Sequence, residues 1–131
     1  MSTKPPPDAA FTVILHPQER ILEVHYPAKP TPDTFDAYDR DVRKAIERLG
    51  GTWDCLVDQT RLQALSPELT PRVAELNHWA RGKGMQRTAR VVSQSAIAEL
   101  QSRRILRESG NEDVGRVYHS RDEAWKALTA K

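Results

Sequence analysis

The sequence contains a single cysteine, Cys55, and no long run of apolar residues, and each absence excludes a class of protein. One thiol cannot form an internal disulfide, a CxxC redox pair or a zinc knuckle. No stretch is long and apolar enough to span a bilayer, and the first residues lack the apolar segment of a secretory signal. We therefore expect a cytoplasmic protein without an integral membrane segment, in which Cys55 is a buried structural thiol.

An excess of charge of one sign is also missing. The 20 Lys and Arg residues stand against 18 Asp and Glu residues, and the net charge of +2 points to no partner. The basic residues form two clusters: Arg81, Lys83, Arg87 and Arg90, and Arg103, Arg104 and Arg107. Because exposed aromatic residues do not alternate with them, we expect solvated surfaces and no nucleic-acid partner.

The motifs of common catalytic and nucleotide-binding sites are absent. The sequence has no GxSxG, no P-loop and no GxGxxG, and Gly82-Lys83-Gly84 follows a predicted helix, whereas a phosphate cradle follows a strand. The four histidines lie far apart in the sequence, without the paired spacing of metal ligands. We therefore expect exposed histidines, no metal, no cofactor and no enzymatic activity.

What the sequence does contain is a regular alternation of strand and helix patterns. A chain of 131 residues with 38% hydrophobic residues can build one modest core, so we predict one domain over residues 10–131. Residues 1–9, with three successive prolines at Pro5–Pro7, are predicted to form a disordered leader.

Nine elements are predicted from periodicity and from capping residues. Strands are expected over residues 11–15, 21–26, 53–58, 88–93 and 114–119, and helices over 32–49, from Thr70-Pro71 to before Gly82, over 95–109, and from Ser120 onwards. Thr31 and Ser120 are expected N-caps, the latter in a capping box with Glu123, and Gly50-Gly51 is expected to stop the first helix.

The order ββαβαβαβα predicts an α/β fold. Strands separated by helices pair in parallel through right-handed crossovers, so we expect a five-stranded, mostly parallel sheet with an antiparallel N-terminal strand and four helices. In the second strand, alternation predicts that Leu22, Val24 and Tyr26 face the core, while the opposite face, with Glu23 and His25, is partly wet.

A ligand is expected at the carboxyl ends of the parallel strands. Asp58, Ser93, Ser95 and His119 lie at these ends, and an Asp, a Ser and a His could together form a hydrolase site. Ser95 is more simply explained as a helix cap. Arg104 lies on the same helical stripe as Ile97 and Leu100, which predicts that it faces the core or a pocket rim and pairs with an acidic ligand or with Asp58.

With this order in place, the chain resembles the SpoIIAA-like branch of the STAS (sulfate transporter and anti-sigma factor antagonist) fold, in the STAS/Sec14-like group. The resemblance covers roughly residues 11–129 and rests on the element order, on Ala89–Ser93, on Leu100–Gly110, and on Val117-Tyr118 followed by Asp122–Trp125. It implies a bacterial regulator that binds a protein partner.

Regulatory members of this family carry Asp-Ser-Ser-Gly after the third strand, where a kinase phosphorylates a serine at a helix N-terminus. The corresponding stretch here, after Asp58, is Ala64–Glu68, without the tandem serine or the glycine. Ser66 could still be phosphorylated at a helix start, which favours anions, but a capping role explains this serine without regulation. We therefore expect a STAS-like domain without the usual phosphoswitch.

Three functions follow, in this order of preference. The first is a non-enzymatic regulatory or interaction module that binds a protein partner, or a second copy as a homodimer. The second is a carrier of a small apolar or lipid-like acidic ligand, with Arg104 at the head group, and the third is the hydrolase. The expected partner-binding residues surround the end of the third strand and the second helix: Leu62, Leu65, Ser66, Leu69 and Trp79.

Overall fold

A β-hairpin opens the fold. The structure, a computed structural model, describes residues 9–63 and 65–130. Strands β1 (Thr12–His16) and β2 (Ile21–His25) pair antiparallel in the register that sets His16 opposite Ile21. Most of the expected leader, residues 1–8, lies outside the described residues, whereas Ala9 is buried.

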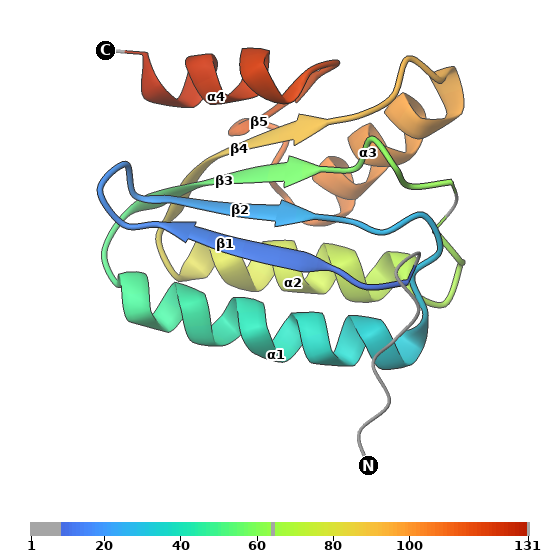
Figure 1. The fold of residues 1–131 in the computed structure, drawn as a ribbon, viewed down its shortest axis with the longest axis horizontal. Coiled ribbons are helices and arrows are strands. Elements are labelled where there is room, and N and C mark those ends of the chain that lie inside the picture. Colours follow the sequence, from blue (N-terminus) through green and yellow to red (C-terminus); the bar gives the residue numbers. More distant parts are fainter. Residues whose placement is uncertain (1–8, 64, 131) are drawn as a thin grey trace.

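Three further strands and four helices follow the hairpin (Figure 1). They are α1 (Pro32–Leu49), β3 (Trp53–Asp58), α2 (Thr70–Gly82), β4 (Met85–Val91), α3 (Ala96–Glu108), β5 (Gly115–Tyr118) and α4 (Arg121–Thr129). The five strands form one mixed sheet in the order β1-β2-β3-β4-β5, in which β1 is antiparallel to β2 and the remaining pairs are parallel. The predicted fold class and the order ββαβαβαβα are confirmed.

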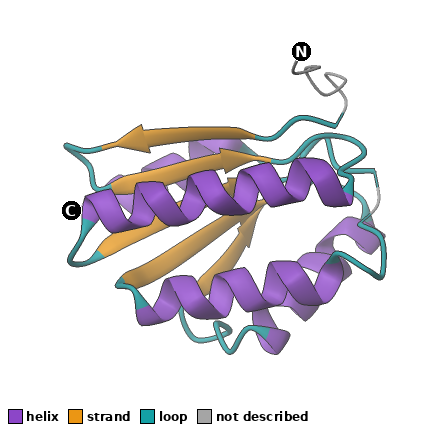
Figure 2. Cartoon of the chain, turned by 90° about the horizontal axis from the view of Figure 1, so that it is seen from below, coloured by secondary structure: helices purple, strands orange, loops and turns teal. Residues whose placement is uncertain are grey.

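The helices divide unequally between the two faces of the sheet. The sheet grows in one direction, from β2 to β5, as the chain proceeds. Right-handed crossovers between successive parallel strands therefore place α1, α2 and α3 on the same face. Figure 2, seen from below, shows helices of this group lying across the sheet. Helix α4 follows the last strand and packs on the opposite face, against β3, β4 and β5.

Short polar side chains begin the helices where the sequence predicts. The Oγ1 of Thr31 accepts a hydrogen bond from the N–H of Thr34, and the Oγ of Ser120 accepts one from the N–H of Glu123. No described bond returns from the Glu123 carboxylate, so the predicted capping box is half formed there. Gly50, after α1, has a φ of 57°, a conformation that a side chain disfavours.

Helix α2 begins at Thr70 after a turn over residues 67–69, so its start agrees with the predicted one at Thr70-Pro71. Its N-cap is Leu69, without a side-chain cap, so Ser66 does not have the predicted capping role. The Oγ1 of Thr70 instead donates to the Ser66 carbonyl.

Two apolar clusters fill the space on the two faces. The larger cluster lies between the sheet and helices α1, α2 and α3, and it contains the buried thiol of Cys55, as predicted. The smaller lies beneath α4 and consists of Ile21, Leu56, Ala89, Val91, Ala124 and Leu128.

Two sequence expectations about the strands differ from the structure. Strand β4 covers Met85–Val91 instead of 88–93, because Met85 and Arg87 pair with Trp53 and Asp54 across a register shift, and their polar surroundings hid this strand start. On the face of β2 that was expected to be partly wet, His25 is partly exposed, but Glu23 is only 3% exposed, because Arg121 of α4 covers it.

Candidate functional site

Asp58 ends β3 at the expected ligand-binding edge, and its carboxylate is already engaged. Its Oδ1 accepts hydrogen bonds from the N–H of Thr60 at 2.9 Å and from the Thr60 hydroxyl at 2.6 Å. Its Oδ2 lies 3.6 Å from Nδ1 of His25, which neighbours it on β2. Asp58 therefore orders the loop after β3 and faces His25.

Glu23 is the centre of a polar cluster on the face of the sheet that α4 covers. His16 and His25 each place Nε2 against its carboxylate, at 2.8 and 2.7 Å. Arg121, the first residue of α4, donates from Nε at 3.1 Å and from Nη2 at 2.8 Å. The two carboxylate oxygens thus face four nitrogens, and the guanidinium of Arg121 also lies over the ring of Trp125.

This coordination keeps Glu23 ionised. Burial by itself raises the pKa of Glu23, but the hydrogen bonds from Arg121, His16 and His25, together with the charge of Arg121, outweigh burial and lower the pKa to about 2. A carboxylate whose lone pairs are occupied in this way is a poor base and a strong structural anchor. The Glu23 cluster therefore joins the hairpin to α4, and the prediction of exposed, isolated histidines is wrong for His16 and His25.

The three residues of the possible hydrolase site are not brought together by hydrogen bonds. Ser95 is exposed and caps α3, accepting from the N–H of Ala98. His119 is exposed just after β5, and Ser93 is half-buried. Within the described parts of the chain, no hydrogen bond joins any two of Asp58, Ser95 and His119, and the Asp58 carboxylate is held by Thr60 instead.

Of the two expected positions of Arg104, facing the core or at a pocket rim, the structure has the second, because Arg104 lines a groove on the surface. It is exposed and its Nε donates to Glu108 at 2.8 Å. The helical face with Ile97, Leu100 and Arg104 was predicted to meet the core because two of its residues are apolar, but Ile97 and Leu100 are 69% and 68% exposed. Helix α3 instead buries Ser102, Ile105 and Leu106. Ile105 lies about 140° around the helix from Leu100, so the apolar pair at the start of α3 faces outward.

The predicted partner-binding residues differ in their exposure. Leu65 and Leu69 belong to the large core cluster, at 8% and 0% exposed, so they offer a partner little or no surface. Leu62 and Trp79 are half-buried against the same cluster, and Ser66 is exposed. The Trp79 ring is covered by the guanidinium of Arg43 at 4.6 Å, so it is not an open apolar contact.

A groove of about 410 Å³ lies between α3 and the beginning of α2. We call it the α2–α3 groove. Its lining residues are Leu65, Pro67, Thr70, Pro71, Gln101, Arg104, Ile105 and Glu108. The exposed Leu100 precedes Gln101 at this groove, and Leu62 lines a small cavity with Ala98 and Gln101. The exposed apolar side chains in this region therefore come from α3 and not, as the sequence predicted, from the loop after β3 or from α2.

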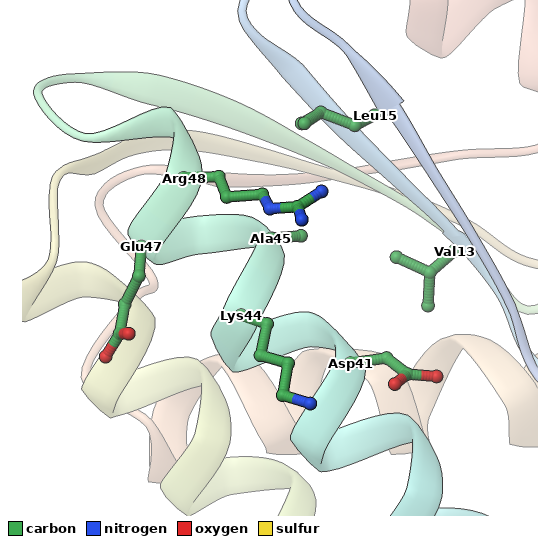
Figure 3. Close-up of a pocket in the computed structure, with 7 residues that line it drawn as sticks. All are labelled: Val13, Leu15, Asp41, Lys44, Ala45, Glu47 and Arg48. Carbon is green, nitrogen blue, oxygen red and sulfur yellow. The ribbon is translucent and has the colours of Figure 1, made fainter.

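A second groove, of about 600 Å³, lies between β1 and α1 (Figure 3). Val13 and Leu15 point from β1 toward the helix, and Arg48 extends toward Leu15 while Glu47 points away. Its other lining residues are Asp41, Lys44 and Ala45. Charges of both signs line this groove, so it favours no anionic or cationic ligand.

The least expected residue of the interior is Arg90, on β4. Its side chain is 0% exposed, and its Nε donates to the Oγ of Ser102 at 2.7 Å. Its Nη1 and Nη2 are buried and have no hydrogen-bond partner in the described structure. Arg90 was expected in a solvated basic cluster, although its place among Ala89, Val91 and Val92 in a strand was a signal of burial.

Asp58 was expected to pair with a core arginine, Arg104, but the arginine in the core is Arg90, and Asp58 cannot reach it. Arg90 pairs in register with Val57, whose neighbour Asp58 points to the opposite face of the sheet. The Glu23 cluster also lies on that other face.

No family model, no curated protein and no solved structure matches the chain. Over residues 9–63 and 65–130, no group of three or more His, Cys, Asp and Glu side chains is arranged to hold a metal ion. None of the described helices combines the length and the apolar character needed to cross a membrane.

Proposed function

We propose that this chain is a non-enzymatic, STAS-like interaction module that binds a protein partner through the exposed apolar face of α3. The observation that carries the proposal is the exposure of Ile97 and Leu100, at 69% and 68%, on the helix whose residues Gln101 and Arg104 line the α2–α3 groove. Two large side chains three residues apart form one apolar patch on a helix, and such patches are costly to leave in water.

The charges around this patch are suited to a protein partner. Glu99 pairs with Arg103 at 3.0 Å, and Arg104 with Glu108 at 2.8 Å, so the patch is rimmed by ion pairs rather than by charge of one sign. An apolar centre with a polar rim is the usual anatomy of a protein interface. The first turn carries Glu99 and the later turns carry Arg103, Arg104 and Arg107, so two antiparallel copies of α3 would set opposite charges face to face.

Carriage of a lipid-like acid with Arg104 at the head group has less support, because Arg104 is exposed and already paired with Glu108. The partner-binding surface that was expected around Leu65 and Leu69 also has less support than the exposed face of α3, because both leucines are buried.

The test is site-specific cross-linking in the native host, with a photoreactive amino acid in place of Gln101, beside the patch. We expect one discrete adduct, either with a single other protein or with a second copy of this chain. Leu100→Glu should abolish this adduct. Because Leu100 is exposed, the free energy of unfolding of this variant should differ from that of the parent chain by less than about 0.5 kcal/mol.

The matched control is Ile14→Thr, which removes an exposed apolar side chain, 39% exposed, from β1. This variant should keep the adduct. Equal adduct yield with Leu100→Glu, or no discrete adduct together with a monomeric chain in sedimentation equilibrium at all concentrations, contradicts the proposal.

A further inference from the structure

Strand β1 forms one edge of the sheet, and this edge lacks the features that normally keep a strand from pairing with another chain. In the described sheet only β2 pairs with β1, and the register runs without a bulge over Thr12–His16. The strand contains no proline and no Asp, Glu, Lys or Arg, and Ile14 is 39% exposed. Sheets commonly protect an edge with charge, proline, a bulge or a short strand. The opposite edge follows this rule, because β5 has four residues and carries the exposed Arg116.

The hydrogen bonds of β2 show which backbone groups of β1 point outward. Arg20 and Tyr26, which flank β2, are both bonded to β3, the first through its carbonyl at 2.9 Å and the second through its N–H at 2.8 Å. Backbone groups alternate in direction along a strand, so the even-numbered residues of β2 face β3 and the odd-numbered residues face β1. Ile14 lies opposite an odd-numbered residue and is bonded within the hairpin. Val13 and Leu15 therefore present their N–H and carbonyl groups at the outer edge.

The groove between β1 and α1 runs along this edge and carries charges of both signs (Figure 3). Asp41, Lys44 and Arg48 are exposed and follow one another at steps of three and four residues, so they lie on one face of α1. Strand β1 and helix α1 run in the same direction (Figure 1). Asp41 accordingly lies at the Val13 end of the groove and Arg48 at the Leu15 end.

We propose that β1 pairs with β1 of a second copy of this chain, antiparallel about a two-fold axis at Ile14, so that two sheets join into one. In this register Val13 of one copy and Leu15 of the other exchange backbone hydrogen bonds, because both residues point outward. Ile14 meets Ile14 of the other copy across the axis in a non-hydrogen-bonded pair, in which side chains approach most closely. The exposed apolar side chain of β1 is thereby covered.

The charges of α1 favour a second copy and select this register. A two-fold axis perpendicular to the sheet keeps both α1 helices on the same face and reverses their directions. Centred at Ile14, it sets Asp41 of each copy opposite Arg48 of the other. A register centred one residue earlier would bring the two Asp41 carboxylates together, and one centred one residue later the two Arg48 guanidinium groups, so repulsion opposes both. Lys44, near the axis, has its own Asp41 three residues away on the same helical face.

This surface is separate from the α3 patch. Strand β1 is one edge of the sheet, whereas α3 packs against α2 and against β5, at the other edge. Self-association through β1 and partner binding through α3 can therefore be lost independently of each other.

The first experiment is sedimentation equilibrium of the full chain over a wide concentration range, in which we expect a monomer–dimer equilibrium. Ile14→Lys places two like charges at the axis and should raise the Kd of the dimer at least about tenfold. Leu100→Glu, on α3, is the control and should keep the Kd of the parent chain. A monomer at every concentration overturns the proposal, as does a Kd that Ile14→Lys leaves unchanged. Loss of the dimer with Leu100→Glu assigns self-association to α3 and also overturns the pairing through β1.

The second experiment tests the register through charge, at positions that are exposed and do not affect the core. Asp41→Arg and Arg48→Asp each set like charges opposite one another in a homodimer, so each should raise the Kd at least about tenfold. An equal mixture of the two variants should form a heterodimer with about the Kd of the parent chain, because each charge then faces one of opposite sign. Arg40→Asp, exposed on α1 outside the groove, is the control and should not change the Kd. A mixture that associates as weakly as the separate variants overturns the two-fold axis at Ile14.

Discussion

Glu23 and Arg90 both carry charge into the interior, and their surroundings are opposite. The Glu23 carboxylate faces four nitrogen atoms, from His16, His25 and Arg121. Among the described residues, the guanidinium of Arg90 donates from Nε to the hydroxyl of Ser102, and its two Nη groups have no ion-pair partner. At the scale of the residue, the partners of a buried charge decide whether its burial is compensated.

Glu23 makes stability depend on acid pH. Its pKa in the folded chain is about 2, below the ordinary value of 4.5, so folding favours the ionised form. This contribution is fully present above pH 4.5 and is lost as the pH falls toward 2. Glu23→Gln should therefore lower the free energy of unfolding at pH 7 by on the order of 3 kcal/mol, as measured by urea denaturation.

The deficit of Glu23→Gln should shrink steadily between pH 5 and pH 2, because the parent chain loses the same interaction on protonation. Glu75→Gln, at an exposed position of α2, is the control and should differ from the parent by less than about 0.5 kcal/mol. A deficit that stays constant down to pH 2 shows that packing, not ionisation, is the cause.

At the scale of the element, the turn that ends α2 packs against the turn that ends α1. The Gly84 carbonyl accepts from the N–H of Trp53 at 3.1 Å, and Nε1 of Trp53 donates to the Lys83 carbonyl at 3.1 Å. Gly84 has a φ of 107°, and a Cβ there would lie 1.9 Å from the carbonyl oxygen of Gly51. This close approach fixes where β3 and β4 begin.

Gly84→Ala should therefore lower the free energy of unfolding by on the order of 3 kcal/mol, through backbone strain and the clash with Gly51. Gly82→Ala, two residues earlier, is the control: its Cβ meets nothing within 4 Å, and the change should be neutral or stabilising by up to about 1 kcal/mol. Denaturant midpoints of the two variants measure this difference. Equal midpoints would mean that the two turns move apart easily.

At the scale of the whole molecule, β3 is the central strand and has a helical layer on each face. Cys55 lies on the side of the three helices, where burial raises its pKa to about 12, the charge of Arg90 opposes this rise, and Asp54 adds to it. Burial and the raised pKa both suppress the thiolate, the reactive form of cysteine. Cys55 is therefore expected to react only when the domain opens as a unit.

With an aromatic disulfide reagent, native Cys55 should react at least about a thousandfold more slowly than the denatured chain, since a stable domain is open only rarely. The positive control is Ser66→Cys in a Cys55→Ala background, because Ser66 is exposed. This control should react at the rate of a free thiol. A fast reaction of native Cys55 would show that the sheet opens locally around β3.

Much of the fold followed from periodicity and caps. The apolar stripe of α1 and the caps Thr31 and Ser120 are local features, and each has its predicted structural effect, as do the core positions Leu22, Val24 and Tyr26. The site was predicted less well because helix rotation is not local. The exposed Ile97 and Leu100 looked like a core stripe, but α3 turns its Ile105 side inward.

The sequence by itself determined the element order, most helix ends and the parallel sheet, because period-two and period-3.6 patterns act over a few residues. Only the tertiary structure decided which groups meet. Arg121 reaches Glu23 from 98 positions away because α4 folds over the sheet, and the register of β3 with β4 sets Arg90 and Asp58 on opposite faces. Such contacts depend on packing between distant segments, which no local pattern encodes.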